Sequence, residues 1–107
     1  MQKTVLNDVF ELLQQIGAVK NESEFSKDWL CRSECYMRTL RFKCKKPSIG
    51  TLAICASKLQ HYGLRMKESE IHVELGKNFI ALSEVCNAQI NSDATCWWQQ
   101  VDMSMTE

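Results

Sequence analysis

Three short stretches of helix-spaced apolar residues lie between Ser23 and Leu59, and two tight connections separate them. Apolar residues three or four positions apart fall on one face of a helix, which must be buried. Helices this short and this closely joined have to pack against one another. The pattern predicts an all-α chain whose centre is a compact arrangement of four to five helices.

The composition permits one folded domain with an uneven charge distribution. The chain has 107 residues, of which 45% are apolar, and a single proline. That is enough to bury a core and too apolar for a disordered chain. The net charge is zero, but residues 20–67 carry eleven Lys or Arg against four acidic residues, whereas residues 68–107 carry seven acidic residues and one Lys. A local basic surface attracts phosphates whatever the total charge is.

Residue patterns typical of helices also lie on both sides of the central segment. Residues 4–16 have an amphipathic pattern, and Gly17 is placed to end that helix in a left-handed conformation. After Pro47, Ser48 is placed to cap a helix that we expect to end at Gly63.

The C-terminal part has a different composition. Residues 68–90 predict a long helix with a narrow, heptad-like apolar seam, and residues 91–93 are turn formers. We expect Trp97 and Trp98 to fold back after that turn, and at least one of them to be docked on this chain or on a partner. The predicted organisation is a helix-turn-helix domain over residues 1–66, and a C-terminal helix and tail over 67–107 that closes the core, forms a dimer, or does both.

The middle of the central segment has the layout of a helix-turn-helix. Ser23 is a candidate N-cap for a helix ending near Leu30, and Ser33 is a candidate N-cap for a helix over 34–42. The second of these helices directs Tyr36, Met37 and Leu40 inward and leaves a polar outer face. Two helices joined by a short turn, the second with an exposed polar face, define the motif.

This segment resembles the helix-turn-helix domains of the phage-repressor superfamily, the Cro, cI and XRE-like proteins, and is similar to short uncharacterised bacterial proteins of that kind. The matching positions are Phe25, Ser26, Ser33, Tyr36, Met37, Leu40, Lys45, Lys46, Pro47, Ser48, Leu52 and Ala56. Three features depart from the family pattern. Leu30, Cys31 and Arg32 fill a turn that usually begins with glycine, Arg41 stands where glutamate is common, and Glu24 replaces a phosphate-binding glutamine.

The resemblance implies that the helix predicted over residues 34–42 enters the major groove of double-stranded DNA. The residues then expected to contact bases are Ser33, Glu34, Cys35, Arg38 and Thr39. Those expected to contact phosphates are Ser23, Arg32, Arg41, Lys43, Lys45 and Lys46. The predicted function is sequence-specific DNA binding by a small bacterial, phage or plasmid transcriptional regulator, such as a repressor, which acts as a homodimer on two half-sites.

The sequence also bears on several other functions. The main alternative is an adaptor or inhibitor that keeps the helix-turn-helix fold but binds protein, because fold does not fix function. Its surface would consist of Trp97, Trp98, Phe42 and the acidic C-terminal helix. Cys31 and Cys35 are a close pair of cysteines, but no second pair follows, so no metal site is expected. No cofactor is expected either. The sequence has no Gly-rich phosphate loop and no paired catalytic groups, so we do not expect an enzyme. An amphipathic N-terminus and the lack of a long apolar run predict a cytoplasmic protein that does not span a membrane.

Overall fold

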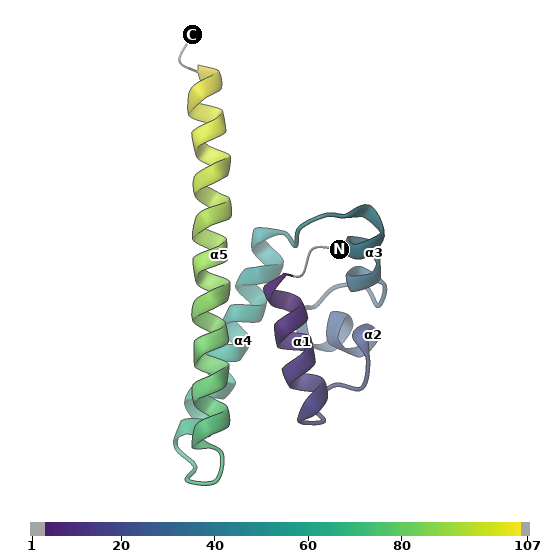
Figure 1. The fold of residues 1–107 in the computed structure, drawn as a ribbon, viewed down its shortest axis with the longest axis vertical. Helices are drawn as coiled ribbons and strands as arrows, with labels where there is room; N and C mark the ends of the chain where they lie inside the picture. The colour runs from purple at the N-terminus through teal and green to yellow at the C-terminus, as the bar shows by residue number, and fades with distance from the viewer. Residues whose placement is uncertain (1–3, 106–107) are drawn as a thin grey trace.

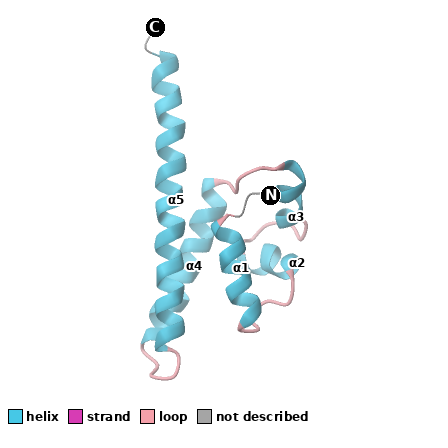
Figure 2. Cartoon of the chain, viewed as in Figure 1, coloured by secondary structure: helices cyan, strands magenta, loops and turns pink. Residues whose placement is uncertain are grey.

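The computed structural model describes residues 4–105, with side chains up to residue 100, and is helical throughout its regular elements. In chain order these are α1 (Val5–Gln15), α2 (Glu22–Glu24), the π-helical turn η1 (Phe25–Trp29), α3 (Tyr36–Lys43), α4 (Ile49–Lys67) and α5 (Val73–Met105). The described part contains no strand, so the all-α prediction with a long C-terminal helix is confirmed (Figure 2).

The helices form a compact body from which one long helix projects. α4 and α5 pair as an antiparallel hairpin, α1 lies against them, and α2 and α3 occupy the side of the body away from α5 (Figure 1). The last part of α5 extends beyond the body. None of the helices in the described residues is long and apolar enough to span a bilayer.

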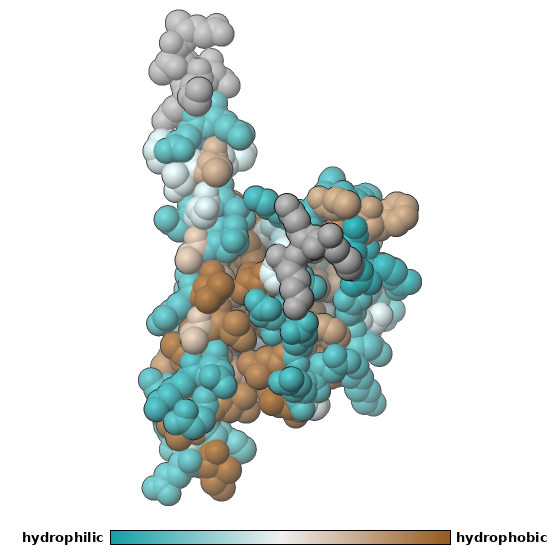
Figure 3. Space-filling model, viewed as in Figure 1, coloured by the Kyte–Doolittle hydropathy of each residue, from teal (hydrophilic) through white to brown (hydrophobic). Residues whose placement is uncertain are grey.

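The core lies where α1, α4 and α5 meet and extends under α2 and α3. Its fully buried large side chains include Leu6, Leu13, Phe25, Leu30, Leu52, Leu59 and Phe79. Burying an aliphatic or aromatic side chain of this size contributes about 1.5–3 kcal/mol. Figure 3 shows apolar surface along the junction of α5 with the body. The periodic stripes seen in the sequence therefore converge on one core.

The second helix starts earlier than predicted and ends in an unusual turn. Asn21, rather than Ser23, is its N-cap, because the Asn21 Oδ1 accepts a hydrogen bond from the Glu24 amide at 2.9 Å. After η1, Cys31 adopts a left-handed conformation with φ of 57°, and the Arg32 amide donates to the Ser26 carbonyl at 2.9 Å. Cys31 thus takes the conformation for which glycine is normally preferred.

α3 begins two residues later than predicted, at Tyr36 instead of Glu34. The Ser33 carbonyl, not its side chain, accepts from the Tyr36 amide at 3.0 Å, so residues 33–36 form a turn before the helix. The hydroxyl of Ser26, which is fully buried, accepts from the Met37 amide at 3.4 Å. A residue of η1 therefore satisfies a first-turn amide of α3 and holds the two elements together.

α4 starts as predicted and ends later. The Ser48 Oγ accepts from the Thr51 amide at 3.2 Å, which confirms Ser48 as the N-cap. The helix does not stop at Gly63 but continues to Lys67. Gly63 is buried at the crossing with α5, where the absence of a side chain permits close backbone approach instead of ending the helix.

α5 runs without interruption through the residues expected to form a turn. The predicted break at 91–93 and the fold-back of the tryptophans are both wrong, since the helix continues to Met105. A side-chain hydrogen bond of 2.8 Å from Gln89 Nε2 to Asp93 Oδ1 spans this region. Trp97 and Trp98 are 67% and 49% exposed on the projecting part, so neither is docked on this chain.

Candidate nucleic-acid interface

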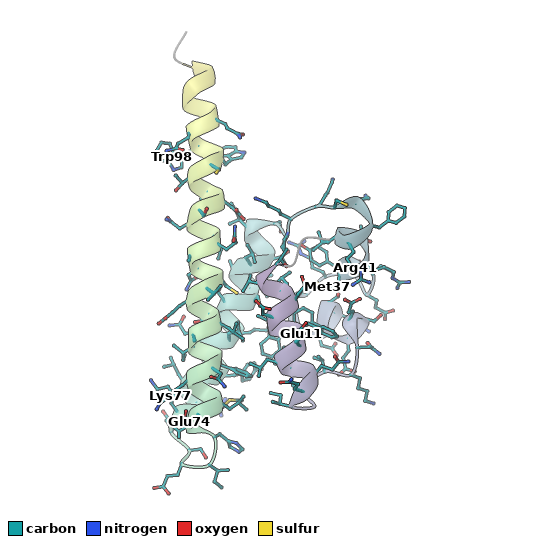
Figure 4. All side chains as sticks on the ribbon, in the orientation of Figure 1. Glu11, Met37, Arg41, Glu74, Lys77 and Trp98 are labelled. Atoms are coloured by element: carbon teal, nitrogen blue, oxygen red, sulfur yellow. The ribbon has the colours of Figure 1, made fainter. Side chains whose placement is uncertain are left out.

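The exposed face of α3 carries part of the predicted base-contacting set. Cys35, Arg38 and Thr39 are exposed and lie three or four positions apart, on the side of α3 opposite the buried Met37. Met37 and Arg41, both labelled in Figure 4, are four positions apart and line one pocket with Thr4 and Asn7, so Arg41 does not belong to the outer face of α3. This outer face is not covered by α5, which lies on the far side of the body (Figure 1).

Ser33 and Glu34, the other two predicted base-contacting residues, lie in the turn that precedes α3, and both are exposed. The Glu34 Oε1 lies 3.9 Å from the Lys27 Nζ in a solvent-exposed ion pair. The Arg38 guanidinium of α3 lies 3.8 Å from the Cys35 sulfur. The structure therefore groups Arg38 and Thr39 on the helix with Cys35 at its N-cap, and places Ser33 and Glu34 in the turn before it.

Arg41 is held by an ion pair that the sequence did not reveal. Its Nη1 donates to the Glu22 Oε2, which links α3 to α2. The hydrogen bond and the opposite charge of Glu22 raise the pKa of Arg41. Arg41 thus has a structural role in joining α3 to α2. Arg41 is near the interface, but Glu22 offsets its charge.

Arg32 joins the turn before α3 to the start of α4. Its Nε donates to the Thr51 Oγ1 at 2.9 Å, and its Nη2 donates to the Ser48 Oγ at 3.3 Å. The Tyr36 hydroxyl bonds the same Thr51 oxygen at 3.1 Å, and the guanidinium lies 5.8 Å from the centre of the Tyr36 ring. This cluster sets the position of α3 relative to α4 and brings an arginine to the positive end of the α4 dipole.

Residues 43–46, at the end of α3 and the start of its connection to α4, form what we call the lysine loop. Cys44, with φ of 51°, ends α3, and Lys43, Lys45 and Lys46 around it are all exposed. The sequence from residue 35 to residue 67 contains eight Lys or Arg and no acidic residue. All charged residues from position 35 to position 67 are therefore cationic, although Glu22 offsets the charge of Arg41 and Glu34 lies just before α3.

Ser23 lies apart from that loop. It is half-buried and lines a shallow groove of about 450 Å³ that also contains Glu22, Glu34 and Arg38. The carboxylates of Glu22 and Glu34 in this groove repel a phosphate. Of the predicted phosphate-contacting residues, the structure gathers Lys43, Lys45 and Lys46 in one loop, places Arg32 at the start of α4, and separates Ser23 from both.

Phe42 is an exposed residue of α3 that does not belong to the predicted DNA interface. Phe42 is 88% exposed and follows Cys35 by seven positions, which places it on the same face. The helical spacing is visible in the sequence, but the predicted base contacts do not include the apolar ring of Phe42.

The sequence profile of a family described as a family of unknown function, DUF6626, matches residues 6–99. The chain belongs to DUF6626. No curated protein and no solved structure matches it. The part of this DUF6626 chain that the profile covers includes all of α3, the lysine loop and both exposed tryptophans.

The six cysteines of this DUF6626 chain are free thiols. Cys31, Cys35, Cys44 and Cys96 are exposed, whereas Cys55 of α4 and Cys86 of α5 are buried. Contact with the Cys86 sulfur, together with burial, raises the pKa of the Cys55 thiol far above its usual range. Within the residues the structure describes, no three His, Cys, Asp or Glu side chains are grouped so as to hold a metal ion.

Proposed function

We propose that this DUF6626 protein binds double-stranded DNA in a sequence-specific manner through α3, as a cytoplasmic regulator of transcription of bacterial, phage or plasmid type. The observation that carries the proposal is the exposed face of Cys35, Arg38 and Thr39, which adjoins a lysine loop in a stretch without acidic residues. A helix presenting polar side chains beside a cationic loop has the two components of DNA recognition, which are base reading and phosphate binding.

The proposed mechanism assigns different roles to α3 and the loop. The major groove admits an α-helix, and each base pair there displays a distinct pattern of donors and acceptors. Arg38 has the donor geometry to pair with guanine, and the Glu34 carboxylate can accept from the cytosine amino group. Lys43, Lys45 and Lys46 neutralise phosphates, which supplies affinity without sequence information and makes binding fall with salt.

A homodimer is the proposed working form, because one domain of this size makes few contacts with DNA. The exposed Trp97 and Trp98, with the half-buried Ile90, lie on the C-terminal part of α5. Asp93 is the only charged residue between positions 85 and 100. Two copies of this helix can therefore approach with little charge repulsion and bury their indole rings against each other.

The same tryptophans favour a second candidate function, a protein-binding adaptor or inhibitor that retains the fold without binding DNA. Exposed tryptophans are common anchors in protein interfaces. The two functions differ in what the lysine loop does. In a DNA-binding protein it is essential for binding, and in such an adaptor it is only a solvated turn.

Binding to random-sequence duplex DNA and to heparin at increasing salt tests the proposal. We expect the wild-type protein to be retained at low salt and released by moderate salt. Changing Lys43, Lys45 and Lys46 together to Gln should flatten the plot of log K against log salt by about 0.9 for each phosphate that is no longer neutralised. Changing Arg65, Lys67 and Lys77 to Gln removes the same charge from the other end of the molecule. Equal behaviour of the two triple variants, or no wild-type binding at low salt, would overturn the proposal.

A further inference from the structure

Phe42 occupies a place on α3 where an apolar ring is unexpected. Successive residues of a helix turn by about 100°, so residues at i, i+3, i+4 and i+7 share one face. Cys35, Arg38, Thr39 and Phe42 have this spacing, and all four are exposed. Phe42 therefore continues the face assigned above to base reading, about 10 Å along the helix axis from Cys35.

The ring makes no contribution to the core. Phe42 is 88% exposed and is not among the residues packed against the buried cluster. Its chain neighbours are Arg41 and Lys43, and no acidic residue lies nearer in sequence on the C-terminal side than Glu68. A single exposed apolar residue is ordinary on a protein surface. Phe42 differs because it lies beside Lys43 and on the same helix face as Arg38.

We infer that Phe42 is a specificity-determining residue that contacts the C5-methyl group of thymine in the major groove. This inference rests on the proposed function. A phenyl ring can neither donate nor accept a conventional hydrogen bond, so it can distinguish base pairs only through apolar surface. The thymine methyl is the apolar group that the major groove displays. Phe42 thus adds an apolar contact to the polar contacts of Arg38 and Glu34.

The position of the ring limits which base pairs it reaches. With a base-pair rise of about 3.4 Å, a separation of about 10 Å along the helix corresponds to roughly three base-pair steps when the helix follows the groove. Phe42 therefore reads thymine at the opposite end of the half-site from the bases near Cys35. Flanking phosphates remain within reach of Lys43 in the same geometry.

Replacing thymine by uracil tests this directly, because uracil lacks only the methyl group. The duplex that the wild-type protein enriches from a random pool is prepared with thymine and again with uracil. We expect wild-type affinity to fall about fourfold on the uracil duplex, the effect of removing one buried methyl group. Phe42→Ala should bind the thymine duplex about fourfold more weakly than wild type and should not distinguish the two duplexes.

Two further variants serve as controls. Phe42→Leu keeps an apolar side chain and should retain part of the preference for thymine. Ile71→Ala removes an apolar side chain that is 87% exposed in the connection between α4 and α5, and should behave as wild type. Because both positions are exposed, all variants should show the wild-type melting temperature.

The possible failures are distinguishable. If wild-type protein binds no duplex at all, the proposed function falls and this inference falls with it. If wild type binds duplex but shows no thymine preference, or if Phe42→Ala keeps the full preference, only the role of Phe42 is wrong. Tighter, Phe42-dependent binding to single-stranded DNA would also overturn it, since the ring would then stack on bases instead of contacting a methyl group.

Discussion

Gly63 of α4 and Gly76 of α5 place the backbones of the two longest helices in direct contact. A Cβ atom added to Gly76 would lie 2.8 Å from the Gly63 carbonyl oxygen, and one added to Gly63 would lie 3.1 Å from the Gly76 carbonyl oxygen. Distances this short leave no space for a methyl group. The pair fixes how closely α4 and α5 approach near the base of their hairpin.

Substitution of Gly76 should therefore destabilise the fold. Gly76→Ala gains about 1 kcal/mol of helix propensity but must shift backbone atoms, at a cost that exceeds this gain. We expect a net loss of about 1–2 kcal/mol, measured by urea denaturation. Gly50→Ala is the matched control, because its added Cβ would meet only the Arg32 side chain at 3.8 Å. Equal stability of the two variants would contradict the close crossing.

The same glycine pair shows what the sequence could and could not predict. Helical periodicity correctly placed the buried side of α3 and the start of α4 at Ser48, because those signals are local. The sequence predicts a helix end at Gly63, since a glycine near the end of a periodic stretch usually marks one. Its actual role depends on contact with Gly76, thirteen positions later, and only the fold reveals that contact.

The misassigned turn at 91–93 has a similar cause. Asn, Ser and Asp favour turns locally, but their helix penalty is only a few tenths to about 0.7 kcal/mol each. The Gln89–Asp93 hydrogen bond and the continuing helix on both sides outweigh that penalty. The side-chain pairs that shape the candidate interface, Arg41 with Glu22 and Arg32 with Thr51, are each nineteen positions apart. No local pattern predicts such pairings.

Accessibility should divide the cysteines into two classes. At pH 8 the four exposed thiols should react with iodoacetamide in the native protein, whereas the buried Cys55 and Cys86 should not. The raised pKa of Cys55 keeps its sulfur protonated at this pH, and a thiol is a much weaker nucleophile than a thiolate. Intact mass should show four adducts in buffer and six in urea. Six adducts under native conditions would show that Cys55 and Cys86 are accessible, which would contradict the packing of α4 against α5.

Removing Glu22 should strengthen DNA binding. Glu22→Gln frees the Arg41 guanidinium from its ion pair, so one more cation is available to a phosphate. We expect higher affinity at low salt and a salt slope steeper by about 0.9. Glu84→Gln removes the same charge from an exposed position on α5 and serves as the control. Identical effects of the two changes would show that Arg41 lies outside the contact surface.

The C-terminal part of α5 should control self-association. Trp97→Ala and Trp98→Ala each remove a large exposed ring from the proposed dimer interface, so we expect dimerisation to weaken about tenfold or more. Sedimentation over a range of concentrations measures this, with Ile71→Ala as an exposed apolar control. A wild-type protein that stays monomeric at every concentration would exclude the dimer, and tryptophan variants that dimerise normally would locate it elsewhere.

The proposed roles of α3 in reading sequence and of the lysine loop in supplying affinity can be separated by selecting bound duplexes from a random pool. Wild-type protein should enrich one motif with two related half-sites about one helical turn apart. Arg38→Ala should relax the preference at one position of each half-site, and Lys45→Ala should keep the motif while binding all duplexes more weakly. Failure of the wild-type protein to enrich any sequence, or an unchanged motif and affinity in both variants, would contradict these roles.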